Sequence, residues 1–175
     1  ANNATLVDTT NTDSNTKDSC TIQNSATSCT VHSPNITAPT NTPTVLGFNT
    51  SASSTSSAWN VNTSKSINSD VTYYAITRKD AVTLTAKFNA NGASLSSTSD
   101  LTCALAAVYN GATQATSCTV TAPTITRSGY NIVGYNTSAS LTSNNSAYNG
   151  STRKITLTAS NTGLTWYAVT YKTLT

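Results

Sequence analysis

Apolar and polar residues alternate in several short stretches of the chain, and this alternation predicts β-strands. The clearest stretches are VTYYAIT at residues 71–77, VTLTAKF at 82–88, CTVTAPTIT at 118–126 and LTWYAVT at 164–170. A period of two turns successive side chains to opposite faces of a strand, so one face can pack into a core. These stretches are rich in Val, Ile, Thr and aromatic residues, which are typical of strands. The pattern therefore predicts a mainly β protein.

Turn signals separate the predicted strands. Asn-Gly pairs at residues 91–92 and 110–111 favour tight turns with positive φ, and YNGS at residues 148–151 predicts a further turn. Proline cannot donate a hydrogen bond to a strand ladder, so we expect Pro34, Pro39 and Pro123 at strand edges or ends.

Two parts of the chain repeat each other. The block ATSCTV occurs at residues 26–31 and 115–120, and NTSAS occurs at residues 49–53 and 136–140. Between these blocks, VLGF at residues 45–48 corresponds to IVGY at residues 132–135. Repetition in register indicates tandem modules, which we place at residues 1–79 and 80–175.

The same comparison predicts how the modules begin and join. We expect ATLVDTT at residues 4–10 to be a strand that corresponds to VTLTAKF at residues 82–88, because both precede a first cysteine by a similar distance. The junction RKDA at residues 78–81 is short and lacks Gly and Pro. A short junction restricts relative motion, so we expect a semi-rigid rod.

The composition supports folding rather than disorder. Ser, Thr and Asn make up close to half of the chain, only 9% of the residues are charged, and Glu is absent. Disordered chains usually combine low hydrophobicity with high net charge, whereas this chain is 37% hydrophobic with a net charge of +3. Each predicted module has enough residues for one small core.

Each predicted module also contains two cysteines, Cys20 with Cys29 and Cys103 with Cys118. Four cysteines allow three pairings, but Cys29 and Cys118 share one position of the repeated block, which favours one disulfide inside each module. Closing such a loop stabilises a module by roughly 3 kcal/mol. Zinc binding is the alternative, but neither pair has zinc-finger spacing and His32 is the single histidine. Disulfides would place the protein in an oxidising, extracellular compartment.

The second module carries an ordered set of motifs. FNANGA at residues 88–93 is followed by APTITRSGYNIVGYNTSAS at 122–140 and LTWYAVTY at 164–171. This order resembles the internalin-type B-repeat, or Listeria-Bacteroides repeat, with its Asn-Gly turn, Pro, Arg-x-Gly-Tyr-x-Φ-x-Gly-aromatic core (Φ, apolar) and closing strand. The core positions are Arg127, Gly129, Tyr130, Ile132, Gly134 and Tyr135.

The first module keeps only part of this pattern. It has Gly47, Phe48 and the Tyr74-Ala75 pair but carries NTPT at residues 41–44 in place of Arg-x-Gly-Tyr. The resemblance implies two tandem β-grasp-like modules with little or no helix. It also implies non-catalytic work, as spacer stalks or as adhesion and protein-interaction modules of bacterial surface and secreted proteins. No residue role carries over from the family.

The residue chemistry does not favour an enzyme. General acid-base catalysis needs titratable groups held close together, and the chain offers one His, no Glu and six Asp that do not recur between the modules. The seven glycines are single and form no phosphate-binding loop, and the Asp spacing does not match a calcium loop. We therefore predict no catalytic residues, no cofactor and no metal site.

Trp59 and Trp166 are the candidate binding aromatics, because flat rings beside Asn and Thr suit the faces of sugars. The favoured interpretation is that these rings belong to the cores of modules with few other large apolar residues. Thr-x-Thr strings such as VTLT and KITLT resemble ice-binding arrays, but they are few and lie at different positions of the repeat.

We therefore predict a non-catalytic region of an extracellular bacterial protein, cell-surface or secreted, that acts as a semi-rigid stalk or an adhesion or protein-interaction module. The alternative is a carbohydrate-binding module that uses exposed aromatic rings. The expected partner is a surface protein or glycan of a host or neighbouring cell. Scattered Lys and Arg disfavour nucleic acid, and no apolar run has transmembrane length. Since the chain begins at Ala1 without an initiator Met or leader, we expect a mature form or a monomeric fragment of a longer repeat protein.

Overall fold

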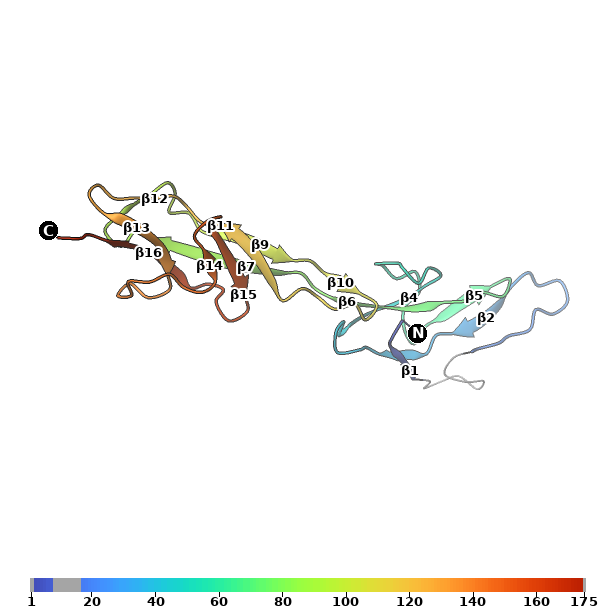
Figure 1. Cartoon of the computed structure of the whole chain (residues 1–175). Coiled ribbons are helices and arrows are strands. Elements are labelled where there is room, and N and C mark those ends of the chain that lie inside the picture. The colour runs from blue at the N-terminus through green and yellow to red at the C-terminus, as the bar shows by residue number, and fades with distance from the viewer. Residues whose placement is uncertain (1, 8–16, 175) are drawn as a thin grey trace. The chain divides into compact units, whose positions relative to one another are not determined.

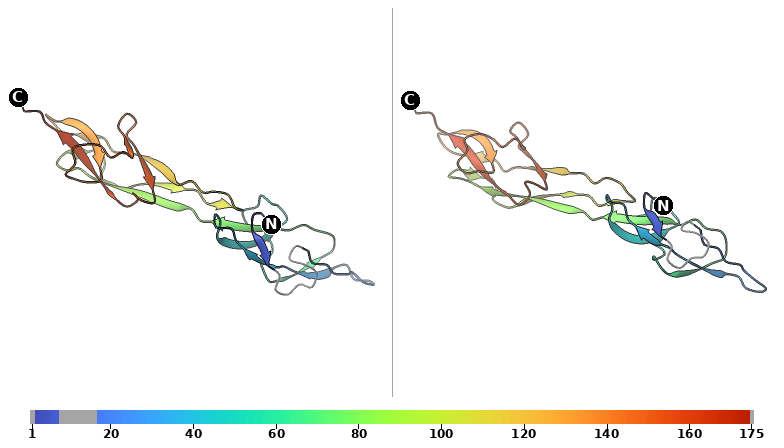
Figure 2. Two further views of the ribbon diagram at one scale, coloured as in Figure 1. Left: turned by 60° about the horizontal axis from the view of Figure 1, so that its bottom comes forward. Right: turned by 90° about the horizontal axis from the view of Figure 1, so that it is seen from below.

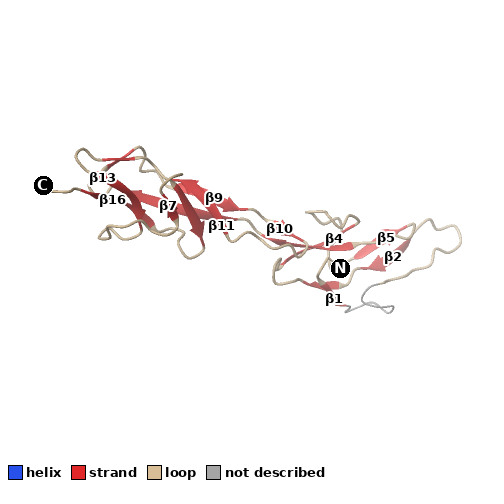
Figure 3. Cartoon of the chain, in the orientation of Figure 1, coloured by secondary structure: helices blue, strands red, loops and turns tan. Residues whose placement is uncertain are grey.

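The computed structural model describes residues 2–7 and 17–174, and this part of the chain consists of strands, turns and loops (Figures 1 and 3). It contains sixteen strands, and no helix occurs within the described residues. The mainly β fold class predicted from the alternation is therefore confirmed, whereas the β-grasp topology stays a prediction.

The chain forms two compact units. Unit 1 contains Ala1–Asp80 and Ala107–Gln114, and unit 2 contains Ala81–Ala106 and Ala115–Thr175. The predicted modules divide the chain between residues 79 and 80, whereas the structure assigns Asp80 and residues 107–114 of the predicted second module to unit 1. The backbone consequently passes between the units three times, at residues 80–81, 106–107 and 114–115.

Unit 2 is built around a four-stranded sheet with the order β13-β16-β7-β9. Its strands are β7 (Val82–Asn89), β9 (Leu101–Leu105), β13 (Asn131–Asn136) and β16 (Thr165–Tyr171). Strand β7 is parallel to β16 and antiparallel to β9, and β13 is antiparallel to β16. Strand β7 therefore occupies an interior position, with a partner on each side.

Two smaller sheets complete unit 2, and their strands can be followed in Figures 1 and 2. One contains β11 (Ser117–Thr121), β15 (Lys154–Thr158) and β14 (Tyr148–Asn149), and the other contains β8 (Ser94–Leu95) and β12 (Ile125–Thr126). The prediction of a single strand at residues 118–126 was wrong. The chain leaves the ladder after Thr121 and re-enters one at Ile125, and Pro123, which has no N–H to donate, lies in the gap.

The core of unit 2 is aromatic at its centre and aliphatic around it. Trp166 and Tyr135 are both 0% exposed. Tyr135 packs edge-on against Phe88 at 5.4 Å and against Tyr148 at 5.5 Å between ring centroids. The buried positions of β7 alternate as the sequence predicted, and they are Leu84, Ala86 and Phe88.

Unit 1 contains shorter sheets. Its strands are β1 (Thr5–Val7), β2 (Cys29–His32), β3 (Asn35–Thr37), β4 (Thr44–Asn49), β5 (Ser64–Ile67), β6 (Tyr74–Lys79) and β10 (Val108–Tyr109). They pair as β1-β3, β2-β5 and β10-β6-β4. A cluster of Ala4, Phe48 and Ala75 is buried, with partly buried apolar side chains packed against it.

Matching contacts in the two units show which segments correspond. Strand β1 pairs with β3 through Leu6 and Ile36, and β8 pairs with β12 through Leu95 and Ile125. Both strands follow an asparagine with positive φ, 48° at Asn2 and 46° at Asn91.

The side chains of these asparagines hold equivalent positions. Asn2 Nδ2 donates to the carbonyls of Ala52 and Ala75, each at 3.0 Å. Asn91 Nδ2 donates to the carbonyls of Ala139 and Ala168, at 3.0 and 3.1 Å. Residues 4–6 therefore correspond to residues 93–95, and the predicted match of residues 4–10 with 82–88 was wrong. The sequence comparison paired two segments because both have strand-forming residues, whereas the asparagine side-chain hydrogen bonds fix the register. Residues 8–10 of the predicted strand lie outside the described part of the chain.

The turn predicted at Asn110-Gly111 is present, and it belongs to unit 1. Strand β10 pairs with β6 through Val108 with Lys79 and Tyr109 with Arg78. The Asn110 backbone N–H donates to the Thr77 carbonyl at 2.9 Å, and Asn110 Oδ1 accepts from the Thr77 N–H at 3.2 Å. Gly111 has φ +82°, and a Cβ there would lie 2.7 Å from Asn3 Nδ2, so a larger residue does not fit.

The Tyr135 ring gives a direct test of the core. Tyr135→Ala should lower the free energy of unfolding by about 3 kcal/mol or more, because the ring is fully buried and its removal leaves a cavity. Chemical denaturation of both variants measures this. Tyr171→Ala is the matched control, since its side chain is 50% exposed and should cost within about 0.5 kcal/mol. Equal effects of the two substitutions would contradict the assignment of Tyr135 to the core.

Candidate functional site

The cysteines pair as predicted. Cys20 bonds Cys29 and Cys103 bonds Cys118, with separations of 9 and 15 residues along the chain. Cys103 on β9 and Cys118 on β11 both pack against the core of unit 2. The longer loop contains residues 107–114, the segment that belongs to unit 1. The greater cysteine spacing of the second module was the signal in the sequence that this loop differs from its counterpart.

The candidate binding aromatics differ in exposure. Trp166 is 0% exposed and lies in the core of unit 2, so a ligand cannot stack on it. Trp59 is half-buried and packs against Phe48 at 5.8 Å and Tyr73 at 4.9 Å, with interplanar angles of 47° and 64°. These rings are tilted against one another, so the group does not form a flat platform for a sugar.

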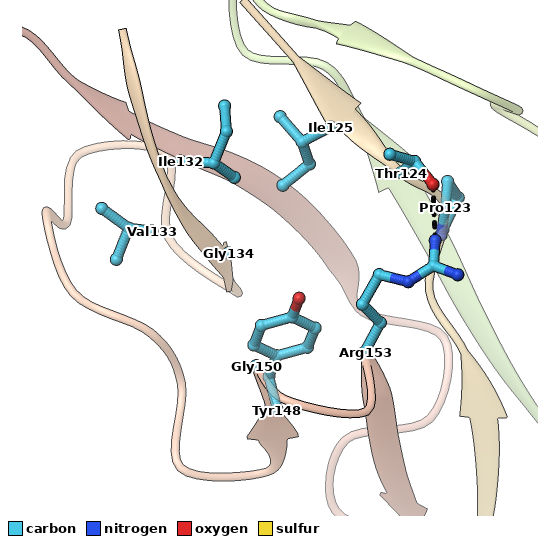
Figure 4. A pocket seen from close by; sticks show the side chains of 9 residues that line it. All are labelled: Pro123, Thr124, Ile125, Ile132, Val133, Gly134, Tyr148, Gly150 and Arg153. Atoms are coloured by element: carbon cyan, nitrogen blue, oxygen red, sulfur yellow. Dashed lines mark hydrogen bonds between the residues drawn. The ribbon is translucent and has the colours of Figure 1, made fainter.

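A pocket in unit 2 lies where β12, β13 and β14 meet (Figure 4). Its volume is about 260 Å³, slightly below the range of roughly 300–1,000 Å³ that small-molecule sites occupy. The lining residues are Pro123, Thr124, Ile125, Ile132, Val133, Gly134, Tyr148, Gly150 and Arg153. Sequence reasoning did not single out this pocket, because its residues come from three separate segments.

A glycine bulge shapes one wall of the pocket. Strand β13 shifts register between Ile132 and Gly134, and Gly134 has φ +138°. A Cβ at Gly134 would lie 2.3 Å from Tyr148 Cε1, so only glycine lets that ring approach the strand. Unit 1 has the same bulge between Val45 and Gly47, where a Cβ would lie 2.4 Å from the Trp59 carbonyl.

The pocket contains one permanent positive charge, on Arg153. Figure 4 shows the Arg153 guanidinium reaching Thr124, to which Nη1 donates a hydrogen bond, with the Tyr148 ring nearby. Burial raises the pKa of the Tyr148 hydroxyl, and the charge of Arg153 partly offsets this. A phenol that keeps its proton near neutral pH can donate hydrogen bonds but cannot act as a general base. Within the pocket, Tyr148 can therefore donate a hydrogen bond but cannot abstract a proton near neutral pH.

The pKa of Tyr135, whose ring packs against Tyr148, is shifted more strongly. Burial raises the pKa of Tyr135 far above its ordinary value, and the neighbouring Tyr148 raises it further, while Arg153 lowers it. Tyr135 Oη donates to the Pro123 carbonyl at 3.2 Å. The protonated phenol is thus the form that this core accommodates.

A Ser-His-Asp grouping in unit 1 has the composition of a catalytic triad but a different geometry. Ser64 Oγ and His32 Nε2 are 2.8 Å apart, whereas Asp18 Oδ2 accepts from the His32 backbone N–H at 2.6 Å. In a triad the carboxylate orients the imidazole by bonding its other ring nitrogen. Asp18 bonds the backbone instead, and His32 and Ser64 are exposed, so this grouping does not form a triad.

The described residues include neither a metal-binding cluster nor a membrane-spanning helix. They contain no group of three His, Cys, Asp or Glu side chains arranged to hold a metal ion. They also include no helix with the length and apolar character needed to cross a membrane.

Comparison of the chain with known proteins found no matching family model, no matching curated protein and no matching solved structure. The resemblance to the B-repeat family therefore rests on the motifs in the sequence and stays a prediction.

The perturbed tyrosine predicts sensitivity to alkaline pH. The pKa of Tyr135 is higher in the folded than in the unfolded protein, so the unfolded state loses its proton first as the pH rises past about 10. The stabilisation from this group is complete below that pH and is lost above it. The free energy of unfolding should therefore fall steeply above about pH 10.

Tyr135→Phe tests the assignment. It should cost about 1 kcal/mol at neutral pH through the lost hydrogen bond to Pro123 and should flatten the alkaline slope, both measured by urea denaturation. Tyr171→Phe, at an exposed ring, should leave the slope as in the parent protein. An unchanged slope in Tyr135→Phe would assign the alkaline sensitivity to other groups.

Proposed function

We propose that the chain is a non-catalytic region of an extracellular bacterial protein, and that its two units work as a stalk or as adhesion or protein-interaction modules. The observation that carries this proposal is the placement of the aromatic rings. Those that follow the bulge glycines, Phe48 and Tyr135, are 2% and 0% exposed. Trp166 is 0% exposed. Rings used for packing in both units favour a structural role over a ligand platform.

The disulfides support the location. Both bonds are formed, and disulfides persist in non-reducing compartments, which indicates an extracellular environment. The bacterial cell surface is the finer assignment that we propose, from the B-repeat-like motifs of residues 122–140. In this proposal the chain is a monomeric part of a longer repeat protein, and its partner is a surface protein or glycan of another cell.

The connection between β6 and β7 suits a load-bearing role. Only Asp80 and Ala81 separate the end of β6 from the start of β7. Arg78 Nε lies 2.7 Å from Asp80 Oδ1, but the two side chains are 36% and 67% exposed, so this pair contributes little stability. Tension applied along the chain would reach the paired strands of each unit through a connection without glycine or proline.

Carbohydrate binding is the second candidate, and the pocket beside Tyr148 is the observation that favours it. An aromatic ring, an Arg and a Thr hydroxyl converge there, which is the combination of apolar wall and polar groups that a sugar requires. Trp59 and Trp166 are less suitable, because one is tilted against its neighbours and the other is buried.

Single-molecule force spectroscopy tests the stalk function. Stretching the oxidised chain from its ends should give distinct unfolding forces, with the residues between bonded cysteines held out of the extension. Reduction should add roughly 70 Å of contour length, because an extended chain spans about 3.5 Å per residue. Before reduction, the double variant Cys20→Ser with Cys29→Ser should have a contour length only roughly 25 Å greater than that of the oxidised parent chain. Extension without a force peak would contradict a load-bearing stalk.

A glycan array tests the alternative. The stalk proposal predicts no saturable binding and no change in tryptophan fluorescence on adding soluble polysaccharide. Tyr148→Phe and Arg153→Asn are suitable variants, since Phe keeps the ring contact with Tyr135 and Asn tolerates the positive φ of 54° at residue 153. A saturable hit that disappears in both variants while they remain folded would make the protein a carbohydrate-binding module. Loss on Trp59→Ala without unfolding would place the sugar at the Trp59 ring instead.

A further inference from the structure

Strand β7 supplies much of the core of unit 2. Its Leu84, Ala86 and Phe88 are at most 8% exposed. It pairs in parallel with β16 at Thr165, Trp166 and Tyr167, and antiparallel with β9 along five residues. Because it has a strand on each side, the sheet of unit 2 is continuous only when β7 is in place.

Unit 1 contains the neighbours of such a strand in the same register. In β4 and β6, Phe48 pairs with Ala75 and Asn49 pairs with Tyr74. In β13 and β16, Tyr135 pairs with Ala168 and Asn136 pairs with Tyr167. Tyr73 of unit 1 therefore stands where Trp166 stands in unit 2. No strand of the described residues pairs with the chain at Tyr73, where β7 would lie.

Three differences between the units accompany the lack of a described partner strand at Tyr73. Tyr73 is only half-buried, whereas Trp166 is 0% exposed. Strand β6 begins at Tyr74, whereas β16 begins at Thr165, the counterpart of residue 72. Cys20 lies outside any strand, whereas its counterpart Cys103 lies in β9 and is paired with β7. Two of the segments that contact β7 in unit 2 thus have counterparts in unit 1 that are less buried or lie outside a strand.

We propose that unit 1 contains an acceptor site for a β-strand, and that this strand would pair with the backbone of residues 72–74. The occupant is an extended polypeptide segment joined in the same chain directly ahead of Ala1. The position of Asn2 carries this choice, because Asn91 lies two residues after β7 and its side chain donates to Ala168, while Asn2 donates to the equivalent Ala75. A strand that entered as β7 does would end next to Ala1.

The site also defines the sequence that it accepts. Phe88 is paired with Trp166 and packs on Tyr135 at 5.4 Å. The equivalent residue of the occupant would pair with Tyr73 and lie against the Phe48 ring, so an aromatic or large apolar residue fits there. Apolar residues two and four positions earlier would share its face, as Ala86 and Leu84 do in β7. The chemistry is β-augmentation, in which backbone bonds supply affinity and alternate side chains supply specificity.

A strand extension of the full chain tests the proposal. The matched extension places the sequence of residues 81–89, AVTLTAKFN, directly ahead of Ala1. The control extension has the same composition, but the residues taken from positions 84 and 85 trade places, as do those from 86 and 87 and those from 88 and 89. This control moves the apolar side chains of residues 84, 86 and 88 to the other face of the strand. A third extension is the matched one with Ser in place of its Phe.

The readout is amide hydrogen exchange of residues 72–76, with residues 165–169 of unit 2 as the internal reference. The matched extension should slow exchange at residues 72–76 by about tenfold or more relative to the parent chain, and the other two extensions should not. Equal exchange with the matched and control extensions would overturn the proposal. So would a parent chain in which residues 72–76 already exchange as slowly as residues 165–169.

A free peptide of the same sequence and sedimentation analysis of the parent chain distinguish other occupants. The proposal predicts a parent chain that stays monomeric as its concentration rises, and peptide protection only at concentrations far above that of the protein. A concentration-dependent dimer with protected residues 72–76 would assign the site to a second copy and overturn the proposed occupant. These outcomes are independent of the force and glycan experiments, so the stalk proposal and the strand site can fail separately.

Discussion

The packing of one aromatic ring behind a glycine bulge sets the core of each unit. Gly134 and Gly47 adopt φ values of +138° and +125°, at the point where the paired strands shift register. A side chain at either glycine would collide with the segment that carries Tyr148 or Trp59. The bulge therefore brings a second aromatic residue against the first, and the remaining core residues pack around that pair. In a chain with so few large apolar residues, losing this contact would remove a large share of the buried area.

The disulfides act together with these small cores. Each bond closes a loop within the sequence repeat, and the Cys103–Cys118 bond ties β9 to β11 on the core of unit 2. The loop that it closes is long enough for residues 107–114 to contribute β10 to unit 1. Asn110 secures this strand by bonding the backbone of Thr77 through both its main chain and its side chain.

Asparagine side chains perform a related role throughout the protein. Asn2, Asn91 and Asn110 adopt positive φ and donate their amide protons to carbonyls more than forty residues away in the chain. Such bonds tie a turn to a distant strand without adding charge, which suits a chain with 9% charged residues. They give these three asparagines a structural role.

The sequence alone determined the local features. Alternation located β7, β16 and the first part of β6, and the repeated blocks gave the disulfide pairing, because both depend on residues close together in the chain or on identical positions. The tertiary structure decided everything that depends on distant partners. It assigned residues 107–114 to unit 1, matched residues 4–6 with 93–95, and buried Trp166 while leaving Tyr73 half-exposed. A strand pattern specifies which side chains face a core, but hydrogen bonds from other segments decide which strand fills which place, and those segments are not adjacent in the sequence.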